Sequence, residues 1–195
     1  MRGPTSLLSL VLACASSPVV ARAQSSAAPP KLGPEVKKLA VMVGRFTNEG
    51  EVKAGAFGPN SPAMKVSGID ECEWTASGFG LVCTETVDTG GTKETETYLI
   101  FYDPISKKYE EHGVRSTGET ENQTGTVSGD TWTWPGEGIV AGKVFHQRYV
   151  MKFVSKDAYE YSSEWSEGEK PLKVGLSGKC TRVAAAKPAP SKPAQ

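Results

Sequence analysis

A two-residue alternation of large apolar and polar side chains runs through most of this sequence and constrains its fold more than any other feature. In residues 144–154 the odd positions include Phe145, Tyr149 and Phe153, whereas the even positions carry a histidine, an arginine and a lysine. Successive side chains of a β-strand point to opposite faces, so this pattern predicts a strand with one face in the core. Apart from a short helical turn at residues 34–39, no stretch has the apolar spacing of a helix. We therefore predict an all-β chain.

Ten segments with strand-like alternation are separated by short connections rich in glycine, aspartate and proline. They are residues 45–52, 63–75, 80–88, 94–102, 108–116, 121–127, 131–134, 144–154, 157–167 and 172–183. Such connections fit hairpins, and no helix is long enough to cross between parallel strands. The sequence thus predicts an antiparallel meander of about eight to ten strands that closes into a barrel and so hides its edges. A sandwich of two sheets is the alternative.

The two ends of the chain differ in composition from this β-rich part. Residues 1–23 combine an early arginine, an apolar run and a small-x-small cleavage site, which is typical of a secretory signal peptide and too short and interrupted for a membrane anchor. Residues 24–33 predict a flexible linker, and residues 184–195 a disordered tail of alanine, proline and lysine. Residues 34–183 form the predicted domain. We expect an exported bacterial protein, periplasmic or secreted, without a transmembrane segment; lipidation at Cys14 is an alternative.

Acidic and basic residues are equal in number along the whole chain, with 22 of each, but not within the predicted domain. All 22 acidic residues and only 17 of the basic ones lie in residues 34–183. This mildly acidic balance argues against a general nucleic-acid binder or a polybasic membrane binder. Two glutamate-rich stretches, residues 94–96 and 119–121, are predicted to be solvated strand surface.

Three cysteines, Cys72, Cys83 and Cys180, follow the predicted signal peptide. In a hairpin that turns at residues 77–78, Cys72 faces Cys83, and the Cβ atoms of opposed residues lie about 4.5–5.5 Å apart, near the separation that a disulfide needs. An oxidising compartment would preserve such a bond. We expect a disulfide between Cys72 and Cys83, with a bridge to Cys180 as the alternative. The spacing of cysteines and histidines does not indicate a metal site.

Four motifs, taken in order, resemble a known family. They are LAVMVGRF at residues 39–46, the cysteine hairpin at 72–83, Tyr102-Asp103-Pro104 with Tyr109, and the strand at 179–183 with Arg182. The chain resembles the bacterial, exported Domain of Unknown Function 1579 family, whose fold is a lipocalin-like (calycin) β-barrel. The resemblance implies that Arg182 covers the ring of Phe46, where tryptophan is usual, and closes one end of the barrel by a cation–π contact. An ordinary exposed arginine at a strand end is the alternative.

The predicted barrel makes a binding protein for small molecules the first functional hypothesis. Barrels of eight or slightly more strands can hold one small ligand, and aromatic side chains commonly line such pockets. The candidate lining residues are Trp74, Tyr149, Phe153, Tyr159, Tyr161 and Trp165. The same rings equally fit a packed core. The expected ligand is small and apolar or aromatic, and no cofactor is expected.

Two other functions are weighed against ligand binding. In a structural or interaction module of the envelope, Trp132 and Trp134 share one strand face and would form an exposed anchor if that face is the outer one. Catalysis is less favoured, because His112 and His146 are isolated in sequence and no nucleophile elbow or metal-ligand cluster is present. We predict a non-enzymatic protein without catalytic or metal-binding residues, with a hydrolase-type activity as the alternative.

Overall fold

The computed structural model describes residues 31–140, 143–167 and 170–184. The predicted signal peptide with Cys14, most of the predicted linker and all but the first residue of the predicted tail lie outside the described residues. None of the described helices is long and apolar enough to cross a membrane.

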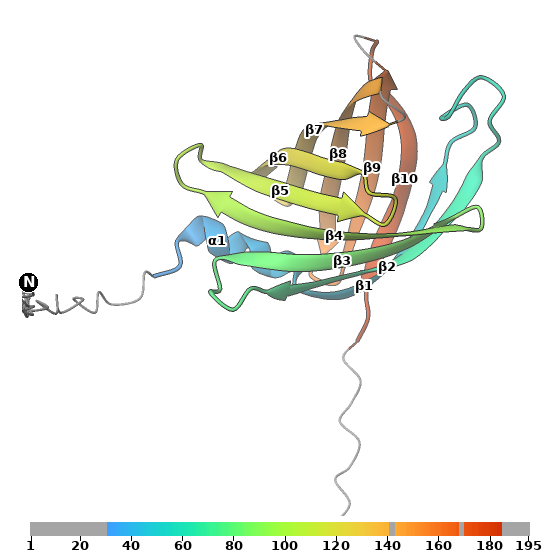
Figure 1. Cartoon of the computed structure of the whole chain (residues 1–195). Coiled ribbons are helices and arrows are strands. Elements are labelled where there is room, and N and C mark those ends of the chain that lie inside the picture. Colours follow the sequence, from blue (N-terminus) through green and yellow to red (C-terminus); the bar gives the residue numbers. More distant parts are fainter. Residues whose placement is uncertain (1–30, 141–142, 168–169, 185–195) are drawn as a thin grey trace, which may run out of the picture. The chain divides into compact units, whose positions relative to one another are not determined.

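The described chain forms a closed antiparallel β-barrel preceded by a short helical segment (Figure 1). The helix α1 (Pro34–Lys38) runs into a 3-10 turn, η1 (Leu39–Met42). The strands are β1 (Gly44–Val52), β2 (Met64–Trp74), β3 (Gly80–Thr89), β4 (Thr92–Asp103), β5 (Lys108–Arg115), β6 (Thr120–Ser128), β7 (Thr131–Val140), β8 (Lys143–Ser155), β9 (Ala158–Glu167) and β10 (Lys173–Arg182). Each strand pairs with its neighbours in sequence, and β1 also pairs with β10. The predicted meander and barrel are thereby confirmed, and the two-sheet sandwich is excluded.

Strand β7 departs most from the sequence prediction. It was expected to end at Trp134, before Pro135, but it continues to Val140. Proline has no N–H to donate, and the β6–β7 ladder contains no pair at either Trp134 or Pro135. On its other side β7 pairs with β8 without a gap, and Pro135 lies opposite Arg148. This ladder keeps β7 extended beyond the proline.

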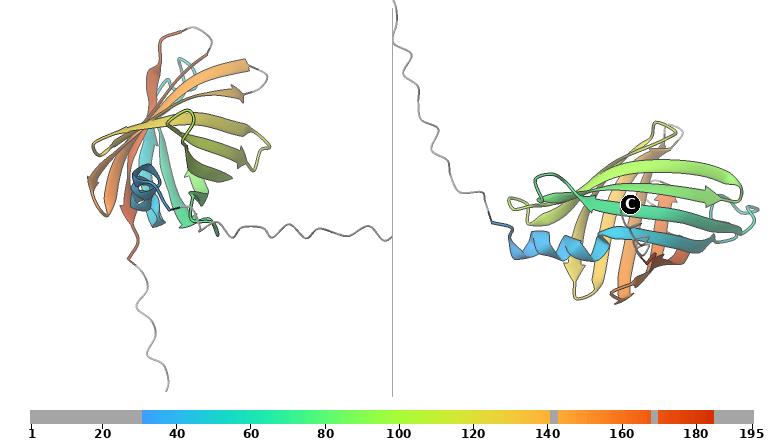
Figure 2. Two further views of the ribbon diagram at one scale, coloured as in Figure 1. Left: turned by 90° about the vertical axis from the view of Figure 1, so that its left-hand side faces the viewer. Right: turned by 90° about the horizontal axis from the view of Figure 1, so that it is seen from below.

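One end of the barrel is closed by the helical segment and by apolar side chains. Leu39 and Met42 of η1 are buried in the main core cluster. The core residues from the adjoining strand ends are Phe46, Leu81, Ile100, Tyr109, Trp132, Trp134, Phe153 and Tyr159. Figure 2 shows α1 at this end from two further directions. We call it the closed end, and the opposite end, which the β3–β4 turn borders, the mouth.

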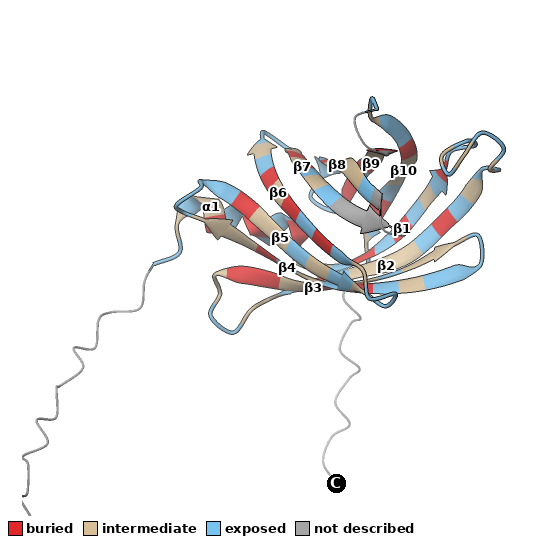
Figure 3. Ribbon diagram, turned by 45° about the horizontal axis from the view of Figure 1, so that its top comes forward, coloured by how far each residue is buried: buried red, intermediate tan, exposed pale blue. Residues whose placement is uncertain are grey.

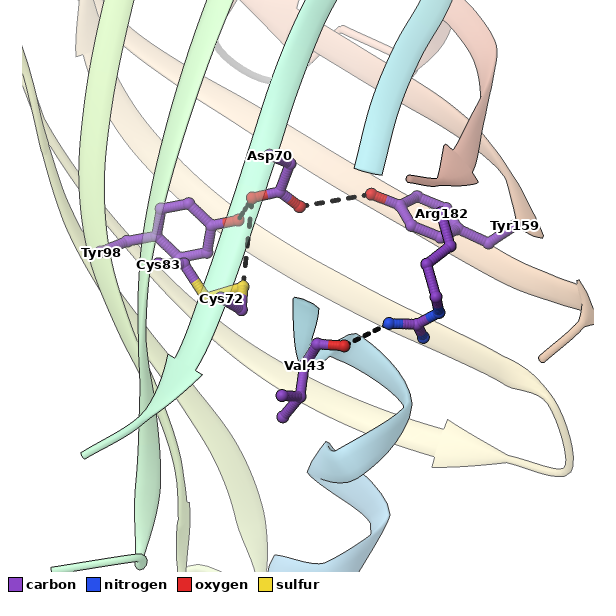
Figure 4. The surroundings of a disulfide bond; sticks show 7 residues. All are labelled: Val43, Asp70, Cys72, Cys83, Tyr98, Tyr159 and Arg182. Atoms are coloured by element: carbon purple, nitrogen blue, oxygen red, sulfur yellow. Dashed lines mark hydrogen bonds between the residues drawn. A yellow bond between two sulfur atoms is a disulfide. The ribbon is translucent and has the colours of Figure 1, made fainter. Parts of the chain in front are cut away.

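Arg182, the last residue of β10, ties several elements together at the closed end. Its guanidinium carbon lies 4.3 Å from the centroid of the Phe46 ring. The guanidinium also donates a hydrogen bond to the carbonyl oxygen of Val43 (Figure 4). It donates another to the carbonyl oxygen of Val41, at 2.9 Å, and lies 3.3 Å from a carboxylate oxygen of Asp157. The arginine therefore links η1, β1, β10 and the β8–β9 turn.

A disulfide joins Cys72 of β2 to Cys83 of β3, as predicted (Figure 4). The two residues lie directly opposite in the β2–β3 ladder, with 4.1 Å between their Cα atoms. Cys180 on β10 is buried and carries a free thiol.

Candidate binding site

The inner face of the barrel is acidic at mid-height. Strand alternation and register place five carboxylic acids there, one each from β2 to β6, and we call them the carboxyl belt: Asp70, Glu85, Glu96, Glu111 and Glu121. Glu85 lies directly opposite both Asp70 and Glu96 in its two ladders. Because like charges directly opposite each other destabilise a sheet, stability of the fold does not explain the belt.

For two of these acids, Glu96 and Glu121, the sequence prediction of a solvated surface position was wrong. The stretches at 94–96 and 119–121 were expected to be solvated surface, but Glu96 is 8% exposed and Glu121 is 9% exposed. Figure 3 shows the alternation of buried and exposed residues along the strands. Glu96 shares its strand face with Tyr98 and Ile100, so the closure of the barrel turns all three inward. The alternation itself was the signal that could have located the belt.

Side chains do not fill the barrel at mid-height. Asp70, Glu85, Tyr98, Glu111 and Tyr149 point inward, yet each is only partly buried. The exposed surface of an inward-pointing side chain faces the space that the strands enclose. A barrel of ten strands is also wider than the eight-stranded barrels that side chains just fill. We conclude that water-sized space separates the side chains at this level.

Tyrosine hydroxyls bind the part of the belt nearest the closed end. Asp70 accepts hydrogen bonds from the hydroxyls of Tyr98, at 2.8 Å, and Tyr159, at 3.4 Å (Figure 4). Burial nevertheless raises the pKa of Asp70 above its ordinary value. Tyr161 of β9 reaches over Gly178 of the intervening β10 and donates to the Asn48 side-chain oxygen of β1 at 2.6 Å.

Burial and mutual repulsion hold protons on part of the belt at neutral pH. Burial, followed by repulsion from Asp70 and Glu96 and opposed by Arg115, raises the pKa of Glu85 to about 8. Burial likewise raises the pKa of Glu96 to about 7. The pKa of Glu111 is raised well above its ordinary value, mainly by burial. The belt is thus a set of coupled carboxyl groups whose charge depends on pH.

Among the described residues, Arg115 is the only lysine or arginine paired with the belt. One guanidinium nitrogen lies 2.7 Å from a carboxylate oxygen of Glu121 and 3.3 Å from one of Glu96. The same side chain also reaches Glu94 near the mouth, at 3.7 Å. One arginine therefore faces five acids.

Two buried acceptor oxygens, one in the belt and one on its neighbour Gln123, have no hydrogen-bond donor within the described part of the chain. The side-chain nitrogen of Gln123 donates to Glu111, at 3.1 Å, and to Glu121, which also accepts from Gln147. The Oε1 atoms of Gln123 and Glu96 are both without a partner. A buried acceptor that lacks a donor costs free energy, so these two atoms require an explanation.

The six aromatic residues predicted to line a ligand site lie on the inner face, at different heights. Trp74, Phe153 and Tyr159 lie toward the closed end, Tyr149 and Tyr161 at mid-height, and Trp165 toward the mouth. Trp165 stacks on Phe57 of the β1–β2 loop, with 5.7 Å between the ring centroids, and donates to the Ala56 carbonyl at 3.3 Å. The sequence prediction thus located aromatic residues of the interior but missed the carboxyl belt.

Trp132 and Trp134 do not form an external anchor. They are 2% and 1% exposed and stack inside the closed end, with 6.0 Å between their ring centroids. The Trp134 indole ring packs directly against the backbone of Gly125. A Cβ atom on residue 125 would lie 2.4 Å from this ring, so only glycine leaves room for it. The indole nitrogen of Trp134 has no hydrogen-bond partner within the described ranges. The surface contact that an interaction module would have used is therefore absent from the outer face of β7.

Both histidines lie on the outer face of the barrel. A ring nitrogen of His112 lies 2.6 Å from the side-chain oxygen of Asn122, and one of His146 lies 3.1 Å from Glu137. In the ranges that the structure describes, no group of three histidine, cysteine or acidic residues is placed to hold a metal ion.

Two surface depressions, each of about 290 Å³, lie at the closed end. One adjoins Phe79 and Phe101, and the other lies between Lys38 of α1 and Tyr109. Neither is lined by the carboxyl belt.

Comparisons with known proteins support the fold. No protein-family model matches the chain, and no curated protein matches it. Among solved structures, Rv2717c from M. tuberculosis is similar with a TM-score of 0.55 and 17% identity, over 78% of this chain and 99% of that one. The S-type phycobiliprotein lyase CPES from Guillardia theta has a TM-score of 0.49 and 10% identity, over 77% and 93% of the two chains. The fold is a lipocalin-like β-barrel, and at these identities the likeness extends to the fold alone.

Proposed function

We propose that this protein binds one small organic molecule inside its barrel. The partly exposed, inward-pointing side chains at mid-height carry this proposal. A barrel that served only as a scaffold would fill its interior with apolar side chains, since packing stabilises it and buried acids do not. Here the main apolar cluster packs at the closed end, and the interior above it combines partly accessible carboxyl groups with the buried Val52 and Val66 toward the mouth.

In this proposal the ligand lies between the carboxyl belt and the aromatic residues at and above mid-height. Tyr149 and Tyr161 form one wall, with 5.7 Å between their ring centroids, and Trp165 stands toward the mouth. Phe153, Tyr159 and Trp74 support this site from the closed end. Their burial beside the core makes them packing residues as well as the floor of the site.

We further propose that the protein is exported and belongs to the Domain of Unknown Function 1579 family. Export rests on the signal-peptide pattern of residues 1–23 and is compatible with the disulfide, which an oxidising compartment would preserve. The family assignment rests on the order of the motifs and is compatible with the lipocalin-like fold.

Binding is favoured over catalysis because the inward-facing nucleophile is poorly suited to react. Cys180 lies inside the barrel, but burial raises the pKa of its thiol to about 12. A nucleophilic cysteine requires the thiolate form, which this environment suppresses. The histidines that could act as bases lie on the outer face.

Native mass spectrometry of the protein purified from its own host tests the proposal. We expect a co-purifying small molecule that Ser163→Trp, which points an indole into the barrel beside Tyr149, displaces. Ser162→Trp is the matched control, because its neighbouring position points outward. Circular dichroism checks that both variants fold. The absence of any bound molecule in the wild type, or its equal retention by both variants, would argue against an interior site.

A further inference from the structure

We infer that the ligand is an organic cation with N–H donors, such as an amidinium, a guanidinium or a primary ammonium group, held by the carboxyl belt. This inference rests on the proposed binding site inside the barrel and specifies the chemical class of its ligand. The belt makes a purely apolar ligand unsuitable, because such a ligand would displace water from carboxyl groups without replacing its hydrogen bonds.

The balance of charge inside the barrel is the first argument. The described interior places Arg115 against five carboxyl groups. Arg115 reaches Glu96 and Glu121, but no arginine or lysine of the described residues is paired with Glu85 or Glu111. Those two acids, like Asp70, stay partly accessible from the enclosed space. A cation in that space would complete the pairing.

The unpartnered oxygens give an independent argument. Gln123 is 6% exposed, and its side-chain nitrogen is directed at carboxyl oxygens of Glu111 and Glu121. Its Oε1 atom therefore remains an acceptor without a donor, as does Oε1 of Glu96. Glu96 Oε1 lies against Gly113, whose missing side chain leaves room for the Glu96 carboxylate, and Gln123 lies on the same inner face, opposite Glu111. Both Oε1 atoms have almost no accessible surface, so a ligand with several N–H groups would satisfy them after a small shift of the two side chains toward the enclosed space. A quaternary ammonium, which has no N–H, could not satisfy them.

Two further observations narrow the class to an organic cation. The described carboxyl groups do not converge in threes as a metal ion requires. The rings of Tyr149 and Tyr161 face the same space, and the faces of aromatic rings attract organic cations.

A set of three probes of nearly equal shape tests the inference. Benzamidine is a planar cation with N–H donors, benzamide is its neutral analogue, and benzoate is the anion. Isothermal titration calorimetry with the full protein at pH 8.5 should give a dissociation constant for benzamidine at least about tenfold below that for benzamide. Benzoate should not bind measurably.

Conservative variants then identify the groups responsible. Glu85→Gln and Glu111→Gln keep the acceptors that bind Asn48 and Gln123 but remove the charge. Each should weaken benzamidine binding by about tenfold and leave benzamide binding unchanged. Glu73→Gln, an exposed residue of β2 outside the barrel, is the matched control and should change neither.

The pH dependence supplies another readout that a merely structural role would not produce. Benzamidine stays protonated between pH 6 and pH 9, whereas Glu85, which faces Asp70, Glu96 and Arg115, loses its proton in this range. Binding of benzamidine should therefore strengthen as the pH rises and should release protons to the buffer. Binding of benzamide should neither strengthen with pH nor release protons.

The outcomes separate this inference from the function on which it rests. Equal or tighter binding of benzamide or benzoate, at a site that Ser163→Trp blocks, would overturn the cationic class and leave an interior binding site in place. Binding of benzamidine that Glu85→Gln and Glu111→Gln do not weaken would also overturn the role of the belt. If none of the probes binds, the inference fails, and native mass spectrometry alone decides whether the barrel holds a ligand.

Discussion

Replacing Glu85 with glutamine should stabilise the protein at alkaline pH, because a buried carboxyl group resists ionisation. The pKa of Glu85 is about 8 in the folded protein, against an ordinary value of 4.5. Between these values the folded state binds more protons than the unfolded state, so the free energy of unfolding falls as the pH rises. The stability is fully present below the unfolded value and is lost as the pH rises through the folded value. This is the opposite of the usual effect of a paired carboxylate.

The magnitude follows from the two pKa values. For a single group with these values, the wild type should lose roughly 3–4 kcal/mol of stability between pH 5 and pH 8. In a domain of this size that corresponds to a fall of about 10 °C in melting temperature. Glu96, with a pKa of about 7, adds a contribution of the same sign, whereas Arg115 opposes both. Glu85→Gln should therefore match the wild type near pH 5 and exceed its stability by a few kcal/mol near pH 8.

Urea denaturation and thermal melting at pH 5, 6.5 and 8 measure this difference. Glu73→Gln, on the outer face, serves as the control and should follow the wild type at every pH. Parallel pH curves for Glu85→Gln and the wild type would refute the reasoning, because they would show that Glu85 ionises at its ordinary pKa. A lower stability of Glu85→Gln at every pH would show that its carboxylate stabilises the fold.

Three further variants test the closed end. Replacing both Cys72 and Cys83 with serine should cost about 2–3 kcal/mol of unfolding free energy in urea, because the bridge restricts the unfolded chain; reductant should reproduce this loss in the wild type and leave the variant unchanged. Arg182→Ala should cost about 1–3 kcal/mol through lost hydrogen bonds and ring contact, and an unchanged melting temperature would exclude a closing role. Gly125→Ala should lower the melting temperature by an amount equivalent to about 1–3 kcal/mol, because its Cβ atom would overlap a buried indole ring; wild-type stability would show that the ring shifts freely.

Strand positions could be predicted because alternation and turn residues are local properties of a sequence. The Cys72–Cys83 pairing followed from the register of a single hairpin, which is also local. The carboxyl belt was missed for a physical reason: alternation shows which residues share a face, but barrel closure decides which face turns inward. Glu96 was assigned to the surface because glutamate is usually solvated, although Tyr98 and Ile100 on the same face indicated the interior.

The pairing of β1 with β10 also determines when this barrel can form. These are the first and last strands, so their ladder joins residues more than a hundred positions apart, from Phe46 with Arg182 to Val52 with Leu176. Contacts so distant in sequence slow folding, and this pair cannot form until the end of β10 has been synthesised. A truncation within β10 would remove two ladders at once and leave β1 and β9 as open edges prone to aggregation. A chain shortened for expression should therefore still extend past Arg182. The hydrogen bonds of this residue to the carbonyl oxygens of Val41 and Val43 stabilise the junction of β1 and β10.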